Sequence, residues 1–194
     1  IIMLFIYRIL INFIFFISPI IIIFRLIKKK EDFYRFKEKF CHFTRNRRNG
    51  KVIWIHGASV GEFQSIVPLI EKYEKKKDIA QILITSNTLS SSKVISKYRF
   101  KKVIHQFFPI DTSYHTKKFL KHWEPSVSMF VDSEIWPNML FNLNKKKIPV
   151  ILINARLTYR SFRRWSRFKQ FSMQVFRNFN LCICSNLKTK IYLK

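Results

Sequence analysis

The chain has 194 residues, which leaves room for one domain, or for one domain and an anchor. Hydrophobic residues make up 48% of it, which excludes a chain too polar to bury a core. With 37 Lys and Arg against 11 Asp and Glu the net charge is +26, so we expect an anionic partner: nucleic acid, a phospholipid surface or a phosphorylated substrate.

The N-terminal 27 residues predict a membrane anchor. Residues 9–24 form an uncharged stretch between Arg8 and Arg25, and three lysines follow at 28–30. As a helix this stretch spans about 24 Å, which is shorter than the roughly 30 Å hydrocarbon core of a bilayer. Adding residues 1–8 makes a crossing possible if the long side chain of Arg8 reaches the far interface. Crossing the bilayer and lying in its interface therefore both stay open.

Three features refine this prediction. Pro19 is expected to kink the anchor helix. A cleaved signal peptide is disfavoured, because lysines rather than a small-residue cleavage site follow the apolar run. The positive cluster at 28–30 predicts that the rest of the chain stays on the cytoplasmic side of the membrane.

Residues 28–50 are expected to form a basic connector, partly helical, near the lipid headgroups. From residue 51 to residue 194, short β-branched or aromatic runs alternate with longer polar stretches that suit helices. Such an alternation predicts a Rossmann-like parallel sheet with helices on both faces. The expected strands cover residues 52–55, 82–85, 103–107, 127–131, 150–153 and 181–184, and the main helices cover 62–77, 112–123, 135–147 and 158–178.

The turn after the first expected strand is a candidate site, because ligands of such sheets bind at the carboxyl ends of the strands. Residues 56–62 hold two of the chain's three glycines, Gly57 and Gly61, together with Ser59 and Glu62. Glycine is hard to replace in a tight turn whose backbone approaches a ligand. Glu62 has two readings: it complements the dipole of the helix that it opens, or it accepts a proton from a hydroxyl nucleophile.

Polar residues follow other expected strands as well. The hydroxyl groups at 85–92 are expected mainly to cap the next helix. Asp132 and Glu134 follow the fourth strand, where one of them or Ser133 can cap a helix whose first turn holds Pro137. Two carboxylates at one strand end are more than a cap needs.

Asn154, Arg156 and Arg160 follow the fifth expected strand. The two arginines are four residues apart, so on a helix they share a face and suit a phosphate clamp. The alternative is two ordinary surface arginines in an Arg-rich chain. Neither the histidines nor the cysteines show metal-ligand spacing, so no metal is expected.

Several of these stretches together resemble one family, the 3-deoxy-D-manno-octulosonic acid (Kdo) transferases. The resemblance covers nearly the whole chain, in the family's order and at roughly its spacing, and includes an apolar N-terminal anchor. The SVGE and ExWPN elements are the most distinctive. The matching stretches are WIHGASVGE at 54–62, PID at 109–111, FL at 119–120, EIWPN at 134–138, IP at 148–149 and NARL at 154–157.

The resemblance implies two facing Rossmann-like domains, the glycosyltransferase B arrangement, of which this chain is the N-terminal, acceptor-binding one. It implies transfer of Kdo from CMP-Kdo, with inversion, to a lipid A precursor (lipid IVA) in lipopolysaccharide biosynthesis. The implied location is the cytoplasmic face of the bacterial inner membrane. The implied partners are the anionic lipid A precursor and the inner-membrane phospholipids, while CMP-Kdo would bind through a C-terminal domain.

The resemblance also implies roles for individual residues. Glu62 stands at the position of the family's general base, and Glu134 at that of a second carboxylate that orients Glu62 or the acceptor. Arg156 and Arg160 would suit the acceptor's phosphates. Ser59, Gly61, Asp132 and Asn154 complete the set expected to bind or orient the acceptor. No cofactor is expected beside the donor substrate, because Lys, Arg and helix ends can meet the charge of its single phosphate.

This sequence departs from the family pattern at several places. The family usually has Glu where this chain has Asp132, a Thr-Gly pair near Ser90 and Ser91, and a Gln near Ser185. Lys194 falls where the family would begin its linker to the donor domain. We therefore expect a fragment or a truncated gene product without the CMP-binding half.

Two other functions stay open. One is a non-catalytic fragment that only binds the membrane and the lipid acceptor. The other is a basic nucleic-acid-binding domain, which the net charge alone favours. Because the chain lacks a Gly/aromatic RNA-binding motif and a zinc pattern, and carries an apolar anchor, we expect no nucleic acid partner.

Overall fold

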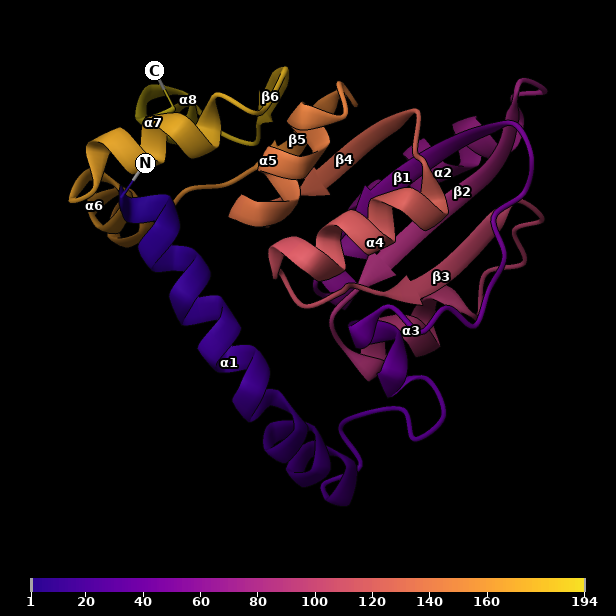
Figure 1. Cartoon of the computed structure of the whole chain (residues 1–194). Helices are drawn as coiled ribbons and strands as arrows, with labels where there is room; N and C mark the ends of the chain where they lie inside the picture. The colour runs from indigo at the N-terminus through magenta and orange to yellow at the C-terminus, as the bar shows by residue number, and fades with distance from the viewer. Residues whose placement is uncertain (1, 194) are drawn as a thin grey trace.

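The computed structural model describes residues 2–193. Its centre is a six-stranded parallel sheet in the order β3-β2-β1-β4-β5-β6 (Figure 1). The chain steps outward from β1 in both directions, which is the doubly wound arrangement. The predicted fold class is thus confirmed. The strands are β1 (Lys51–His56), β2 (Ile79–Ser86), β3 (Val103–Phe107), β4 (Val127–Val131), β5 (Val150–Ala155) and β6 (Leu181–Cys184).

Helices connect consecutive strands and cover both faces of the sheet (Figure 1). A long helix, α1, precedes the sheet, and a short 3-10 helix, η1, lies between them. The helices are α1 (Ile2–Ile27), η1 (Phe36–Phe40), α2 (Val60–Glu74), α3 (Leu89–Ile95), α4 (Ser113–Trp123), α5 (Pro137–Lys145), α6 (Tyr159–Ser166), α7 (Lys169–Phe176) and α8 (Leu187–Tyr192).

The side chains of β1 alternate between two hydrophobic cores, one on each face of the sheet. Val52 and Trp54 pack with apolar residues of α4, α5 and α7, whereas Ile53 and Ile55 pack with those of α2 and α3. Trp54 is fully buried, and its Nε1 donates a hydrogen bond of 2.9 Å to Thr85 Oγ1, so its polar atom is satisfied.

Two predicted details were wrong. The helix expected over 158–178 is two helices, α6 and α7, because the chain leaves the helical path around Phe168. Helix α5 does begin at Pro137, but no side chain of 132–134 caps it: its N-cap residue, Trp136, makes no side-chain cap bond. The buried Asp111 caps it instead, since its carboxylate accepts the backbone N–H groups of Asn138 and Met139 at 3.0 and 2.8 Å.

Helix α1 runs through Pro19 as one continuous helix. Proline has no N–H, so the carbonyl of Phe15 loses its usual donor four residues on. The Ser18 hydroxyl donates to that carbonyl at 2.7 Å and replaces the lost bond. Helix α1 is long and apolar enough to cross a bilayer, and it stands alone in this among residues 2–193.

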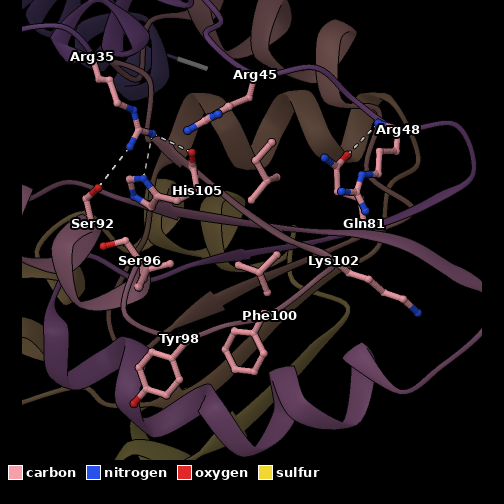
Figure 2. Close-up of a pocket in the computed structure, with 13 residues that line it drawn as sticks. Arg35, Arg45, Arg48, Gln81, Ser92, Ser96, Tyr98, Phe100, Lys102 and His105 are labelled. Atoms are coloured by element: carbon pink, nitrogen blue, oxygen red, sulfur yellow. Dashed lines mark hydrogen bonds between the residues drawn. The ribbon is translucent and has the colours of Figure 1, made fainter.

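The basic connector is fastened to the open edge of the sheet, along β3 (Figure 2). Arg35 donates to the backbone oxygen of His105 at 2.8 Å and to Ser92 Oγ at 3.4 Å, and the backbone N–H of Arg48 donates to Gln81 Oε1 at 3.0 Å. The carboxylate of Glu38, within η1, is buried and binds Arg35. The bond to the His105 oxygen occupies a backbone group of the edge strand that would otherwise invite pairing with another chain.

Candidate active site

The turn between β1 and α2 holds Glu62 folded back against its own backbone. Ser59 is the N-cap of α2 and accepts the backbone N–H of Glu62 at 3.3 Å. In return the Glu62 carboxylate accepts the Ser59 hydroxyl and the Ala58 backbone N–H, both at 2.8 Å. This reciprocal arrangement is a variant of the capping box, in which the carboxylate accepts the backbone N–H one residue before the N-cap. Glu62 therefore does help to cap α2, as the structural alternative predicts.

The two glycines of the turn differ in what they permit. A Cβ atom at Gly57 would lie 3.3 Å from Glu62 Cβ, so glycine there lets the Glu62 side chain fold into the turn. A Cβ atom at Gly61 would meet nothing within 4 Å, because that position faces an open cavity. Of these two glycines, only Gly57 is closely packed against another residue.

The environment of Glu62 favours its neutral form. Partial burial raises the pKa of its carboxyl group, and the negative charges of Glu134 and Asp132 add to this effect. The Ala58 and Ser59 hydrogen bonds work in the opposite direction, but the net pKa lies above its usual value. A carboxylate with a raised pKa is a stronger proton acceptor, which suits a general base.

Glu62 lines an open cavity of about 330 Å³ at the carboxyl ends of β1, β4 and β5. The cavity brings together five residues that the sequence had singled out, and it adds polar groups from α2 and from the turn after β6. Its lining comprises Gly61, Glu62, Ser65, Val131, Asp132, Asn154, Arg156, Ser185 and Asn186.

Two lining residues have unusual backbone conformations. Asp132 and Asn154 adopt positive φ angles of 62° and 51°, in the left-handed region that Asp and Asn enter more readily than most residues. Such strain is common at functional sites, where it places a side chain that a regular strand end would direct elsewhere. The amide of Asn154 reaches across the cavity and donates to Ser65 Oγ at 3.1 Å.

Glu134 belongs to a chain of hydrogen bonds that begins in the core at Trp54. His56 Nε2 is 3.0 Å from Glu134 Oε2, and His56 Nδ1 is 2.9 Å from Thr85 Oγ1, which accepts the Trp54 indole N–H. With its proton on Nε2, His56 donates to Glu134, and its Nδ1 accepts the Thr85 hydroxyl. The Thr85 carbonyl oxygen also lies 3.2 Å from Nδ1, where a protonated imidazole would donate to it. Trp136 Nε1 also donates to Glu134 Oε2, at 2.9 Å.

These bonds keep Glu134 ionised. Burial alone would raise its pKa, but the bonds from His56 and Trp136 outweigh burial and lower the pKa below its usual value. The two glutamates therefore differ: Glu134 holds its charge, and that charge raises the proton affinity of Glu62. The sequence analysis assigned no role to His56, although it stands in the motif at 54–62. Its position at the carboxyl end of a strand could have marked it as a residue of the site.

The two arginines of the predicted phosphate clamp do not share a helical face. Helix α6 begins at Tyr159, so Arg156 lies before it in the loop. Arg156 lines the Glu62 cavity, whereas Arg160 lines a separate hollow with Tyr159 and three further arginines of the α6 region. Ser65, Ser185 and Asn186 were missed as lining residues; Ser65, one turn after Glu62 on α2, could have been found from helical spacing.

The side chains of residues 2–193 form no cluster of metal ligands. Across residues 2–193, no group of three or more His, Cys, Asp or Glu side chains is placed to hold a metal ion.

Comparisons with known proteins identify relatives of this chain. Residues 34–194 match the model of the family described as 3-deoxy-D-manno-octulosonic-acid transferase (kdotransferase). A 3-deoxy-D-manno-octulosonic acid transferase of Rickettsia bellii is 38% identical over 161 residues, covering 83% of this chain and 38% of the relative. A probable mitochondrial 3-deoxy-D-manno-octulosonic acid transferase of Arabidopsis thaliana is 36% identical over 165 residues, covering 84% of this chain and 37% of the relative. The chain thus spans somewhat under two fifths of the length of these relatives.

Solved structures share the fold at low sequence identity. A UDP-N-acetylglucosamine 2-epimerase superposes with a TM-score of 0.52 at 13% identity, covering 75% of this chain and 44% of the epimerase. The UDP-GlcNAc 2-epimerase of Neisseria meningitidis gives a TM-score of 0.52 at 15% identity, covering 74% of this chain and 42% of that one. At these identities the likeness concerns the arrangement of the sheet and helices alone.

Proposed function

The chain belongs to the 3-deoxy-D-manno-octulosonic acid transferase family, and from this premise we propose that it is the acceptor-binding half of a Kdo transferase. The observation that carries the proposal is Glu62, a partly buried carboxylate with a raised pKa, at the mouth of a polar cavity on the carboxyl edge of the sheet. The whole protein would join this half to a donor-binding half that holds CMP-Kdo. As part of the proposal, residues 1–27 are a membrane anchor, 28–50 a connector and 51–194 the acceptor-binding domain.

In the proposed reaction a sugar hydroxyl of a lipid A precursor attacks the anomeric carbon of Kdo. The new bond joins the acceptor oxygen to that carbon, while the bond from the carbon to the CMP phosphate oxygen breaks and the electron pair leaves with CMP. Glu62 takes the hydroxyl proton as the oxygen attacks. Attack on the face opposite CMP gives inversion.

The other lining residues have roles that follow from their chemistry. Arg156 is exposed and lines the cavity that holds Glu62, so we assign it to a phosphate of the acceptor. Asn154, Ser185 and Asn186 offer amide and hydroxyl groups for the sugar hydroxyls. Asp132 and Glu134 raise the pKa of Glu62, and Ser59 holds its carboxylate in place.

Arg160 has a different place in the proposal. Because it lies in a separate hollow, we assign it to phosphate at the lipid surface rather than to the sugar beside Glu62. We propose no metal and no cofactor beside the donor, and no nucleic acid partner. The location proposed is the cytoplasmic face of a bacterial inner membrane.

Binding by the chain itself tests this proposal. In detergent micelles, the chain should bind a bisphosphorylated lipid A precursor more tightly than its dephosphorylated form, and should not bind CMP-Kdo. Arg156→Gln should weaken acceptor binding by about tenfold, as expected for a lost charge-assisted phosphate contact. Arg99→Gln is the matched control, because Arg99 is exposed in the loop before β3, away from the cavity. Binding of CMP-Kdo without acceptor binding would overturn the assignment of this half.

A further inference from the structure

Helix α1 contacts the domain near its start. The Tyr7 hydroxyl donates to Asp111 Oδ2 at 2.7 Å, and Arg8 Nε donates to Asn138 Oδ1 at 3.1 Å. Asp111 and Asn138 are at most 1% exposed, and Asp111 caps the start of α5, to which Asn138 belongs. The Tyr7 ring also lies 6.3 Å from the ring of Phe171 in α7. The first turns of α1 thus complete a buried polar network of the domain.

The contacts continue along the helix. The Phe15 ring lies 4.9 Å from the ring of His115, and Ser18 and Ile22 are both only 6% exposed. From Tyr7 to Ile22 the helix rises about 22 Å. Figure 1 shows the same path, with one end of α1 near α6 and α7 and the other end beyond the α3 side of the sheet. The contacts of α1 with the domain thus extend from Tyr7 to Phe15, and the same face of the helix is buried again at Ser18 and Ile22.

These contacts could not form if α1 crossed a bilayer. A crossing helix carries its two ends to opposite sides of a hydrocarbon core about 30 Å thick. Tyr7 and Arg8 would then lie on the far side of the bilayer, out of reach of Asp111 and Asn138. With the Tyr7 and Arg8 bonds formed, both ends of α1 stay on the side of the domain.

The opposite face of α1 is a continuous apolar stripe that the domain leaves uncovered. Its members recur every three or four residues, and Ile2, Phe16 and Ile27 are 75%, 76% and 75% exposed. Soluble proteins rarely expose an apolar surface of this extent without a partner. The further members are Phe5, Ile6, Ile9, Phe13, Ile20, Ile23 and Phe24.

Cationic hollows lie near both ends of the stripe, and no carboxylate lines either of them. Near the end of α1, Arg25, Lys29, Lys30 and Lys93 line a hollow of about 380 Å³ with Thr88, Leu89 and Ser90. Arg25 is ion-paired with Glu31 at 2.6 Å, so the three lysines supply the charge of this hollow. At the start of α1, the α6 region presents a hollow of about 360 Å³. That hollow is lined by Tyr159, Arg160, Arg163, Arg164 and Arg167. An apolar stripe bordered by cations complements a leaflet of anionic phospholipids.

We propose that α1 lies in the plane of an anionic phospholipid leaflet and does not cross the bilayer. The stripe enters the acyl chains, and the two cationic hollows meet the headgroup phosphates. Asp111 and the start of α5 lie at the carboxyl edge of the sheet, as Glu62 does, so α1 holds this edge at the lipid surface. A lipid acceptor would then approach the cavity from the leaflet itself. The inference extends the membrane attachment in the proposed function, but it rests on the contacts of α1 and not on the chemistry of Glu62.

Depth measurements along the stripe test this orientation. Phe5→Cys, Phe13→Cys and Phe24→Cys change exposed side chains, and each carries a fluorophore in the full chain with Cys182 and Cys184 replaced by serine. Cys41 is 1% exposed and stays unlabelled. The proteins are reconstituted in vesicles of phosphatidylethanolamine and phosphatidylglycerol that contain lipids brominated at defined depths.

An in-plane helix places all three probes at the same shallow depth, as we expect. A crossing helix places the probe at 13 deep and those at 5 and 24 shallow, and that profile would overturn the proposal. Probes that no brominated lipid quenches would overturn it as well, because the stripe would then be covered by protein. Kdo transfer by Glu62 is untouched by any of these results, so the two proposals can fail separately.

Discussion

The change Glu62→Gln separates the two roles that the structure gives this side chain. Glutamine keeps the size and can still accept the Ala58 N–H and bond to the Ser59 hydroxyl, which the carboxylate now meets at 2.8 Å each. Loss of the charge near the start of α2 costs at most about 1 kcal/mol of folding free energy. The amide cannot take a proton, however, and a general base typically contributes about 10² to 10⁴ in rate, or about 3 to 5 kcal/mol of barrier.

The assay needs this chain joined to the donor-binding half of a related transferase. Transfer from CMP-Kdo to the lipid A precursor is followed at saturating acceptor, and unfolding is followed by urea titration. We expect kcat to fall by at least about two orders of magnitude while the free energy of unfolding changes by less than about 1 kcal/mol. Glu71→Gln, on the exposed side of the same helix, is the control and should leave both quantities unchanged.

Two results would refute the reasoning. A Glu62→Gln enzyme that transfers Kdo at nearly the parent rate would remove the general-base role, and Asp132 or Glu134 would be the next carboxylates to change. An enzyme that loses stability and activity in parallel would leave Glu62 as a structural cap only.

Three further predictions concern the surroundings of Glu62 and α5. Glu134→Gln removes a charge that raises the pKa of Glu62, so the acid limb of the kcat/KM profile should move to lower pH; an unmoved limb contradicts the coupling. Gly57→Ala places a Cβ 3.3 Å from Glu62 Cβ and so displaces the carboxylate. We expect kcat to fall in the transfer assay, while urea titration shows little change in the free energy of unfolding. Asp111→Ala leaves two backbone N–H groups of α5 without their acceptor and should lower the free energy of unfolding by about 2 to 4 kcal/mol; a loss below about 1 kcal/mol would contradict this.

Much of the sheet could be predicted from the sequence. The expected bounds of β3, β4 and β6 match those observed, and the other three strands are only longer than expected. Buried parallel strands are short apolar runs between helical stretches, which makes them legible without knowledge of their neighbours. The carboxyl-edge rule likewise led to Asp132, Asn154 and Arg156 beside Glu62.

What could not be predicted depends on contacts between residues distant in sequence. Asp111 caps α5 from 27 residues away, so the nearer Asp132 and Glu134 looked like better caps. The docking of α1 depends on Tyr7 and Arg8 finding partners more than 100 residues on, and the hydrophobicity of the segment is the same whether it crosses a membrane or lies on one.

Product analysis of the completed enzyme tests the central proposal most directly. This chain, joined to the donor-binding half of the Rickettsia bellii relative, is incubated with CMP-Kdo and bisphosphorylated lipid A precursor, and the lipid is examined by mass spectrometry. We predict a precursor that has gained Kdo in the parent enzyme and an unchanged precursor in the Glu62→Gln enzyme. Release of CMP with free Kdo and an unmodified lipid, from a folded enzyme that binds CMP-Kdo, would contradict an acceptor-binding role for this chain.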